Sequence, residues 1–522
     1  MSVLLWLKRD LRVHDHAALV AAIHQARGTN ESLVALYAFE PAWLESADTS
    51  RRHIHFFYAA ALGLQSTLKK LGIPLLIQHG PLKPLFEKLQ HIEPLTHVMC
   101  HEETGLMWSY KRDLAVQRWC AQRQVVYTEF PQNGVVRRLK SRDGWAVKWA
   151  QRMKQMQLDV PDAWPHNPAW DKHEIRELWA SIPRLNSLTE SLPFDSWMDE
   201  EFPIATEDAA QACLASFLQE RVLGYSKNIS SPVQAWSGCS RLSPYLSAGI
   251  LSVRQVTQAT ELAAQSWKSP SNASDLANRS LALRSLRSFG ARLRWHCHFM
   301  QKLEDEPELD RRSLWSGVNH LRNESTEDWS TIEHARLEAW KTGRTGYPMI
   351  DACMRCLQQT GWINFRMRSM LASFASYQLW LHWRETGLHL ARLFIDYEPG
   401  IHWSQMQMQS GSTGINTLRM YSPTKQAKEQ DPEGVFIRLW IPELERVPLA
   451  YLAQPWLMGR QTQEEAGCTI GVDYPSPIVD EQTSLQHAKE VMYGLRKLPQ
   501  YATDSARIAK KHGSRKSFRR AS

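Results

Sequence analysis

The chain has 522 residues, of which 43% are hydrophobic and 22% charged, and its formal net charge is +8. This length predicts two or more domains with large cores. No apolar run approaches the roughly 18 residues of a membrane span, and the N-terminus becomes charged too early for a secretory signal. These features exclude an integral membrane protein, and we expect a cytoplasmic protein.

The first 130 residues alternate between strand and helix patterns. Apolar runs predict strands at residues 2–7, 33–39, 74–78, 97–100 and 125–130, and amphipathic segments predict helices at 15–26, 52–71, 84–92 and 109–122. Such repeated units predict a parallel, Rossmann-like α/β domain with right-handed crossovers. No GxGxxG follows the first strand, and no GxxxxGK followed by Ser or Thr occurs. The common dinucleotide and triphosphate fingerprints are therefore absent.

The rest of the sequence divides into three parts. Residues 131–204 are rich in proline, tryptophan and charge without a regular period, which is typical of a surface connector. Residues 205–490 show helical patterns almost throughout and predict a large all-α domain. Residues 491–522 form a basic tail, which we expect to be disordered.

The tail carries most of the net charge. Seven Arg and Lys residues lie between Arg507 and Arg520 without an acid among them, so the rest of the chain has a net charge of +1. A nucleic-acid site on the body of the protein would therefore be a local patch. The tail is either a solvated terminus or a non-specific attractor of phosphates.

The cysteines and histidines do not indicate a metal site. The eight cysteines are scattered, which fits a reducing compartment. Cys353 and Cys356 form a CxxC pair in a helical segment, but only Cys468 follows them, so a four-cysteine cluster is not expected. His296 and His298 are two residues apart and would point to different faces of a helix.

Four dense stretches in the helical part, 236–252, 288–307, 339–370 and 394–426, combine basic, aromatic and small residues. In the first, Ser240, Arg241 and Ser243 precede a helix, where hydroxyls and a cation suit a phosphate or form a simple N-cap. Basic side chains interleaved with aromatic ones suit a groove for unstacked bases.

The chain resembles the photolyase/cryptochrome family. The resemblance rests on four segments in the family's order, at residues 4–19, 239–252, 343–368 and 430–444. It implies an α/β antenna domain followed by a helical domain that binds FAD, and an antenna chromophore of folate or deazaflavin type is also compatible with it. It further implies light-driven repair of pyrimidine dimers in UV-damaged DNA: reduced FAD gives an electron to a flipped-out lesion and later receives it back.

The resemblance implies three groups of site residues. The positions matching cofactor contacts are Tyr225, Cys239, Ser240, Arg241, Leu242, Ser243, Arg368, Asp396 and Glu398. The positions matching DNA or lesion contacts are Arg292, Trp295, Phe365, Arg366, Met408, Arg419 and Gln426. The positions matching the electron-transfer chain and the residue facing the flavin N5 atom are Trp383, Trp329 and His402.

Several positions depart from the family pattern. Arg292 stands where a lesion-facing acid is usual, and Met406 and Met408 replace two tryptophans. The other departures are Cys239 for Thr or Gly, Glu398 for Asp, Asn364 and Phe365 for the two histidines of (6-4) photolyases, and Trp108 and Ser109 for the folate contacts. With Met406 in place of the proximal tryptophan, we expect photoreduction of the flavin to be slow or to use a substitute such as Trp403 or Tyr421.

Three functions fit these features. The leading hypothesis is a monomeric DNA photolyase of an unusual branch. The alternative is a cryptochrome-like blue-light photoreceptor without repair activity, which would explain the missing lesion contacts. The third is a flavin protein that has lost its photochemistry and serves as a binding module. Likeness of fold alone cannot decide among them.

Overall fold

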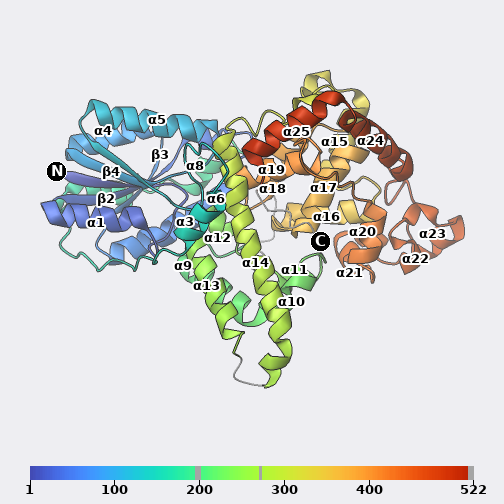
Figure 1. Ribbon diagram of the computed structural model, residues 1–522, viewed down its shortest axis with the longest axis horizontal. Helices are drawn as coiled ribbons and strands as arrows, with labels where there is room; N and C mark the ends of the chain where they lie inside the picture. Colours follow the sequence, from blue (N-terminus) through green and yellow to red (C-terminus); the bar gives the residue numbers. More distant parts are fainter. Residues whose placement is uncertain (194–201, 270–272, 515–522) are drawn as a thin grey trace.

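Five parallel strands form the N-terminal sheet in the computed structural model, which describes residues 1–193, 202–269 and 273–514 (Figure 1). The strands are β1 (Ser2–Leu7), β2 (Ser32–Phe39), β3 (Leu75–His79), β4 (Leu95–His101) and β5 (Val126–Phe130), in the order β3-β2-β1-β4-β5. The predicted strands and the parallel sheet are confirmed. From β1 the sheet extends through β2 and β3 on one side and through β4 and β5 on the other. The carboxyl ends of β1 and β4, which lie on either side of this switch point, therefore flank a crevice.

Helices cover both faces of the sheet. Val3, Leu5 and Leu7 of β1 pack with α1 (Ala17–Thr29) and α3 (Arg51–Lys70). On the opposite face, Leu4 and Trp6 pack with α4 (Leu82–Ile92) and α5 (Met107–Gln122). Successive side chains of a strand point to opposite faces, so a strand covered on both sides reads as a continuous apolar run.

The segment predicted as a surface connector contributes to the α/β layer. It contains α6 (Trp145–Met153), α7 (His173–Ala180) and α8 (Leu185–Thr189), and residues 194–201 lie outside the described residues. Ile175 and Leu178 of α7 are buried in the same cluster as Leu4 of the sheet. The prediction of a connector draped over the surface is therefore wrong for α7. This helix is short and rich in charged residues, so its sequence did not show a helical period.

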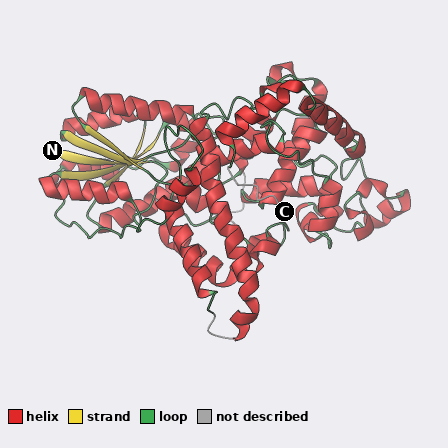
Figure 2. Cartoon of the chain, viewed as in Figure 1, coloured by secondary structure: helices red, strands yellow, loops and turns green. Residues whose placement is uncertain are grey.

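Helices dominate the rest of the described chain, as Figure 2 shows, and this confirms the prediction of a large helical domain. The α/β part also contains the short α2 (Pro41–Leu44). The helices between residues 205 and 305 are α9 (Glu207–Ser216), α10 (Val222–Asn228), α11 (Ala235–Gly238), α12 (Ser243–Ser247), α13 (Val253–Ser266) and α14 (Ala273–Asp305). Those that follow are α15 (Thr331–Lys341), α16 (Pro348–Thr360), α17 (Phe365–Ser373), α18 (Trp383–Leu393), α19 (Pro399–Gln409), α20 (Pro423–Gln430), α21 (Val435–Trp440), α22 (Leu449–Leu452) and α23 (Arg460–Ala466).

Local sequence sets where these helices begin and end. Helix α16 starts with Pro348 in its first turn, where a missing N–H is tolerated, and ends at Gly361, whose φ of 70° is left-handed. The next helix, α17, therefore starts in a new direction four residues later. Helix α14 packs against α10, α13 and α19 and forms one side of the candidate site described below.

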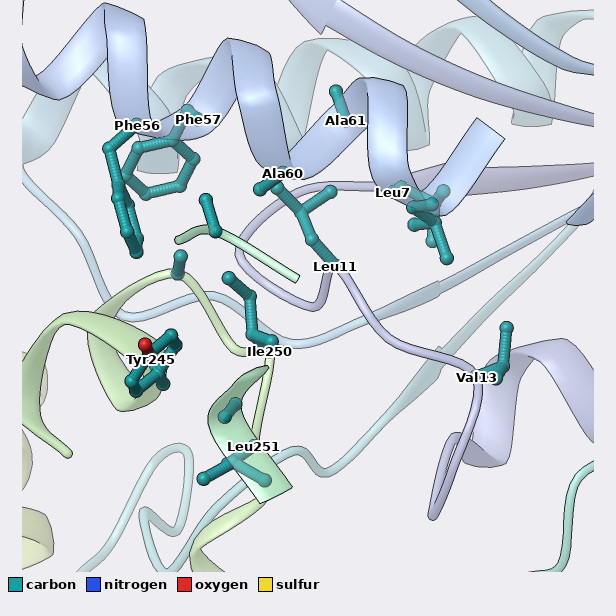
Figure 3. Close-up of a cluster of buried hydrophobic side chains, with 14 of the residues drawn as sticks. Leu7, Leu11, Val13, Phe56, Phe57, Ala60, Ala61, Tyr245, Ile250 and Leu251 are labelled. Atoms are coloured by element: carbon teal, nitrogen blue, oxygen red, sulfur yellow. The ribbon is translucent and has the colours of Figure 1, made fainter. Parts of the chain in front are cut away.

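One continuous core joins the α/β and helical parts. Leu7 and Leu11 lie in the same buried cluster as Phe56 of α3 and Tyr245 and Ile250 of the helical part (Figure 3). Backbone contact at this junction is close, because a Cβ added at Gly249 would lie 2.0 Å from the carbonyl oxygen of Arg9. The junction is thus packed like a domain interior.

The basic tail is helical for most of its length. Helices α24 (Glu481–Arg496) and α25 (Pro499–His512) are ordered, and Ile508 packs in a buried cluster with Trp315 while Tyr501 lies against it. The prediction of disorder is therefore wrong up to His512: the dense charges of the tail hid an amphipathic pattern. Residues 515–522, with four of the seven cations, lie outside the described residues. Among the described helices, none is both long and apolar enough to cross a membrane.

Candidate active site

A cavity of about 280 Å³ lies within the helical part, between α10, α14, α17 and α19. Eleven of the predicted site residues line it. They are Tyr225, Cys239, Ser240, Arg241, Ser243, Arg292, Phe365, Arg368, Asp396, Glu398 and His402. Residues from five separate segments of the sequence thus meet in one place.

The predicted phosphate-binding segment forms part of the cavity wall. Ser240 and Ser243 line the cavity, whereas Leu242 is buried in the core behind them. The guanidinium of Arg241 lies between two indoles, 4.2 Å from the ring centre of Trp236 and 4.1 Å from that of Trp362. Its φ of 56° is left-handed, and the cation–π contacts fix this side chain on the wall.

A bidentate ion pair crosses the cavity floor. The Nη1 and Nη2 atoms of Arg368 each donate to Asp396 at 2.9 Å, and the guanidinium lies 4.1 Å from the ring centre of Phe394. Burial opposes the charge of Asp396, but Arg368 outweighs it and holds the pKa of Asp396 below its usual value. The ion pair predicted by resemblance is present, and its place beside a flavin ring stays a prediction. We call Tyr225, Ser240, Ser243, Arg368 and Asp396 the inner wall.

A second charged pair was missed at the level of sequence. Nε2 of His296 lies 2.8 Å from Oε2 of Glu398, and both residues line the cavity. Burial disfavours the charged imidazole, but the neighbouring carboxylate outweighs burial and raises the pKa of His296 well above its usual value. The sequence suggested His296 only as a metal ligand, because no local pattern indicates a partner 102 positions away.

His402 is a neutral ring that donates one hydrogen bond. Its Nε2 donates to the carbonyl oxygen of Gly387 at 2.9 Å, so the lone pair of the neutral ring is on Nδ1. Burial lowers the pKa of His402 to about 4. The ring therefore stays uncharged at neutral pH and, unlike His296, cannot serve as an acid.

The residues predicted to touch DNA fall into two sets. Arg292 and Phe365 line the cavity, their guanidinium and ring centre are 5.7 Å apart, and Phe365 is exposed; we call these two residues the rim. The others do not line the cavity: Trp295, Arg366, Met408, Arg419 and Gln426. Of these, Trp295 follows Arg292 by one turn of α14 and packs edge-on to His298 at 5.0 Å.

The predicted electron-transfer tryptophans are not all in contact. Trp383 is buried, and its ring centre lies 5.9 Å from that of Trp403. Trp329 contacts His334 instead, and within the described parts of the chain no ring contact joins Trp329 to Trp383. Met406 lines the cavity at the position expected for the proximal tryptophan.

One buried group in the N-terminal part has the composition of a metal site. Asp10, His16 and His101 place ligand atoms within 4.8 Å of one another. However, the amide of Leu19 donates to Nδ1 of His16 at 3.0 Å, so the proton of the neutral ring is on Nε2, the atom that faces Asp10. Asp10 also accepts from Nδ1 of His101 at 2.8 Å. These contacts fit a hydrogen-bonded network that ties β1 to β4 better than a metal centre.

The crevice at the carboxyl ends of β1, β2 and β4 is the place where an antenna chromophore would be expected. Its cavity is only about 30 Å³, because Arg112 bridges it with bonds to Glu40 at 2.9 Å and Glu103 at 2.5 Å. Trp108, one of the two departures from the folate pattern, stacks beside Arg112 at 5.3 Å, and the other, Ser109, is buried and donates to the carbonyl oxygen of Leu106. A second chromophore stays a prediction.

The cavity lining fits a large polar ligand such as FAD. Asn364 and Gln409 are buried and line the cavity, yet Asn364 Oδ1 and Gln409 Oε1 have no hydrogen-bond partner within the described chain. Unpaired buried polar atoms are costly, so a bound group with its own donors would stabilise them. The serine hydroxyls suit a diphosphate, and the pair of Arg368 and Asp396 suits a polar heterocycle.

Comparisons with known proteins agree with this geometry. Residues 3–155 match the family described as DNA photolyase, and residues 289–494 match the FAD binding domain of DNA photolyase. The chain is 30% identical to the deoxyribodipyrimidine photo-lyase of Escherichia coli (strain K12), over 92% of this chain and 96% of that protein. It is 27% identical to the cryptochrome DASH of Gloeobacter violaceus, over 92% and 93% of the two chains.

A solved structure shows the same fold. The bacterial class III photolyase from Agrobacterium tumefaciens superposes with a TM-score of 0.78 at 22% identity, over 95% of this chain and 98% of that one. Proteins named photolyase and proteins named cryptochrome thus both align over nearly the whole chain.

Proposed function

The chain belongs to the photolyase/cryptochrome family and binds FAD, and on that premise we propose that it repairs UV-induced pyrimidine dimers in DNA by light-driven electron transfer. The observation that carries this proposal is the cavity itself. Its inner wall offers the hydroxyls and the ion pair that a flavin nucleotide needs, and its rim offers an exposed aromatic ring beside a cation.

FAD in its reduced, light-excited state would supply the electron that opens the dimer. The chain's own residues would bind and orient it. Tyr225, Ser240 and Ser243 would hold the diphosphate and ribityl groups, Cys239 would border them on the cavity wall, and Leu242 would support that segment from behind. The ion pair of Arg368 and Asp396 would flank the isoalloxazine ring, and His402 would present a neutral acceptor to it.

The rim would receive the lesion. Arg292 is a donor where relatives carry an acid, so it would hydrogen-bond a carbonyl oxygen or a phosphate of the dimer. Phe365, and Trp295 one turn along α14, offer apolar surface for flipped-out bases. Arg366 and Arg419 would contact phosphates, and Met408 would border the DNA path without entering the cavity. Gln426 is buried, so a contact between its side chain and DNA is not part of this proposal.

The direct test is repair of a defined lesion. Oligonucleotides that carry one cyclobutane dimer or one (6-4) product are mixed with the flavin-loaded, reduced protein and illuminated, and the products are separated by chromatography. We expect light-dependent loss of the cyclobutane dimer and none in the dark. Persistence of both lesions in the light, with flavin bound and reduced, would reject repair.

A cryptochrome-like photoreceptor is the second candidate. Arg292 and Met408 favour it, because two positions that match lesion contacts of the family depart from its pattern here. Under this candidate, light would alter flavin absorbance without any change in either lesion, and the affinity for damaged DNA would equal that for undamaged DNA.

A further inference from the structure

Tyr397 occupies a position on the cavity wall that the proposed function leaves unused. It lies in the turn between α18 and α19, and its sequence neighbours Asp396 and Glu398 are the acids of the two charged pairs. Tyr397 lines the cavity and is otherwise buried. A flavin in the cavity would therefore have a phenol on its wall, whereas the indole of Trp403 is not part of the lining.

The phenol of Tyr397 has a buried proton acceptor. Its hydroxyl donates to Oδ2 of Asp48, a residue that the α/β part contributes between α2 and α3. Asp48 is buried, its other carboxylate oxygen accepts from the hydroxyl of Ser46, and it forms no ion pair within the described chain. Among the residues that the structure describes, no cation therefore pairs with this carboxylate in place of the phenol.

Trp403 holds the phenol from the other side. Its Nε1 donates to the hydroxyl oxygen of Tyr397 at 3.0 Å. The fold makes room for this indole, because a Cβ added at Gly387 would lie 2.6 Å from the Trp403 ring and 3.3 Å from Met406. Trp403 and Met406, the residue that replaces the expected wall tryptophan, thus both lie against Gly387, but only Met406 lines the cavity.

The aromatic contacts continue toward the surface. The ring centres of Trp403 and Trp383 are 5.9 Å apart at an angle of 72°. Nε1 of Trp383 donates to the hydroxyl oxygen of Ser313 at 3.1 Å, and Ser313 is partly exposed. Tyr397, Trp403 and Trp383 therefore form an unbroken path from the cavity to a surface loop.

Proton and electron loss are linked in a phenol, because removal of an electron makes the hydroxyl a strong acid. Burial and the negative charge of Asp48 raise the pKa of Tyr397 well above its usual value, so the resting group keeps its proton at neutral pH. A phenol without an acceptor would have to form a buried cation, which a low-dielectric site disfavours. With Asp48 already hydrogen-bonded, the proton can leave as the electron does, and no net charge is created on the ring.

We propose that Tyr397 is the electron donor that reduces oxidised, light-excited flavin in this protein, and that Asp48 accepts its phenolic proton. One electron passes from Tyr397 to the flavin, the O–H bond breaks, and the proton moves to Oδ2 of Asp48, which leaves a neutral phenoxyl radical and a neutral carboxylic acid. A soluble one-electron reductant, such as a thiolate, then returns an electron through Trp383 and Trp403, and Asp48 returns the proton. The proposal depends on bound flavin but not on repair of DNA.

The test is photoreduction of the FAD-loaded protein with dithiothreitol in solution. Flavin absorbance gives the rate, and rapid-freeze electron paramagnetic resonance, with and without ring-deuterated tyrosine, identifies the radical. We expect a phenoxyl signal in the wild type that narrows on ring deuteration. In Tyr397→Phe we expect no such signal and a rate at least tenfold lower. In Asp48→Asn, which keeps the shape of the acceptor without its basicity, we expect a rate at least fivefold lower.

Matched controls separate this role from a structural one. Tyr421→Phe should retain the wild-type rate, and each variant is first compared with the wild type for flavin content and circular dichroism. A rate in Tyr397→Phe equal to that of the wild type, a radical of tryptophan alone in the wild type, or a loss of rate in Tyr421→Phe would each overturn the proposal. Repair is measured separately with wild-type protein reduced by dithionite, and its absence would count against the proposed function while leaving the photoreduction result intact.

Discussion

The inner wall and the rim belong to the same cavity but follow the family to different extents. The inner wall keeps the residue types of the family at Tyr225, Ser240, Ser243, Arg368 and Asp396, and the predicted ion pair is formed. The rim carries Arg292 where an acid is usual, and Phe365 where one of the two histidines of (6-4) photolyases would stand. The residues that bind the cofactor and those that would bind the substrate can therefore differ independently. The similarity that establishes FAD binding does not by itself identify the lesion.

The largest effect is expected on the inner wall. Removal of one partner of the buried ion pair in Arg368→Ala leaves Asp396 charged and unpaired, which costs about 3 kcal/mol of unfolding free energy. Flavin should also be lost during purification. Denaturant unfolding and the ratio of flavin to protein absorbance measure both effects. Arg368→Lys, which keeps the charge but not the bidentate geometry, should retain part of the stability and part of the flavin. Full flavin content in Arg368→Ala would show that flavin binding by the inner wall does not depend on this ion pair.

The pair of His296 and Glu398 should make stability depend on pH. The pKa of His296 is raised above its usual 6.5 in the folded state, so the folded protein binds this proton more tightly than the unfolded chain. The resulting stability is fully present below about pH 6.5 and declines as pH rises toward the folded-state pKa. The difference in unfolding free energy between wild type and His296→Gln should be about 2 kcal/mol at pH 6 and smaller at pH 8. A difference that grows with pH would contradict a charged His296.

Substitutions at the rim should weaken DNA binding without loss of the flavin. Arg292→Ala should weaken binding of an oligonucleotide with a dimer about tenfold, since a charge-assisted hydrogen bond contributes roughly 1.4 kcal/mol. Arg287→Ala is the matched control, because Arg287 is exposed on the same helix and does not line the cavity. Fluorescence anisotropy gives Kd for damaged and undamaged DNA. Equal losses of DNA affinity in Arg292→Ala and Arg287→Ala would mean that Arg292 acts only as a surface charge.

The smallest effect is expected outside the cavity. Arg419 is exposed, so Arg419→Ala should weaken the binding of damaged and undamaged DNA equally, by about threefold. It should also reduce the slope of log Kd against log salt concentration by about one. A change confined to damaged DNA would place Arg419 at the lesion and extend the rim.

Much of the fold follows from the sequence, but its polar contacts do not. The five strands were predictable because strands buried on both faces read as apolar runs. The meeting of Ser240, Arg368 and Asp396 was predictable only through the family resemblance, since no local pattern links segments so far apart. His296 with Glu398, and Tyr397 with Asp48, were missed because each pair joins different elements and each residue alone is unremarkable. Helix α25 was missed because charge was given more weight than its apolar stripe.

The most direct test of the central claim, that FAD and the lesion share this cavity, is the absorbance of the bound, reduced flavin during titration with DNA in the dark. We expect an oligonucleotide with one cyclobutane dimer to perturb the flavin spectrum saturably and the same sequence without the dimer to leave it unchanged. In Arg292→Ala we expect the midpoint of the titration to shift to higher DNA concentration. Identical spectra with damaged and undamaged DNA at saturating binding would contradict the claim.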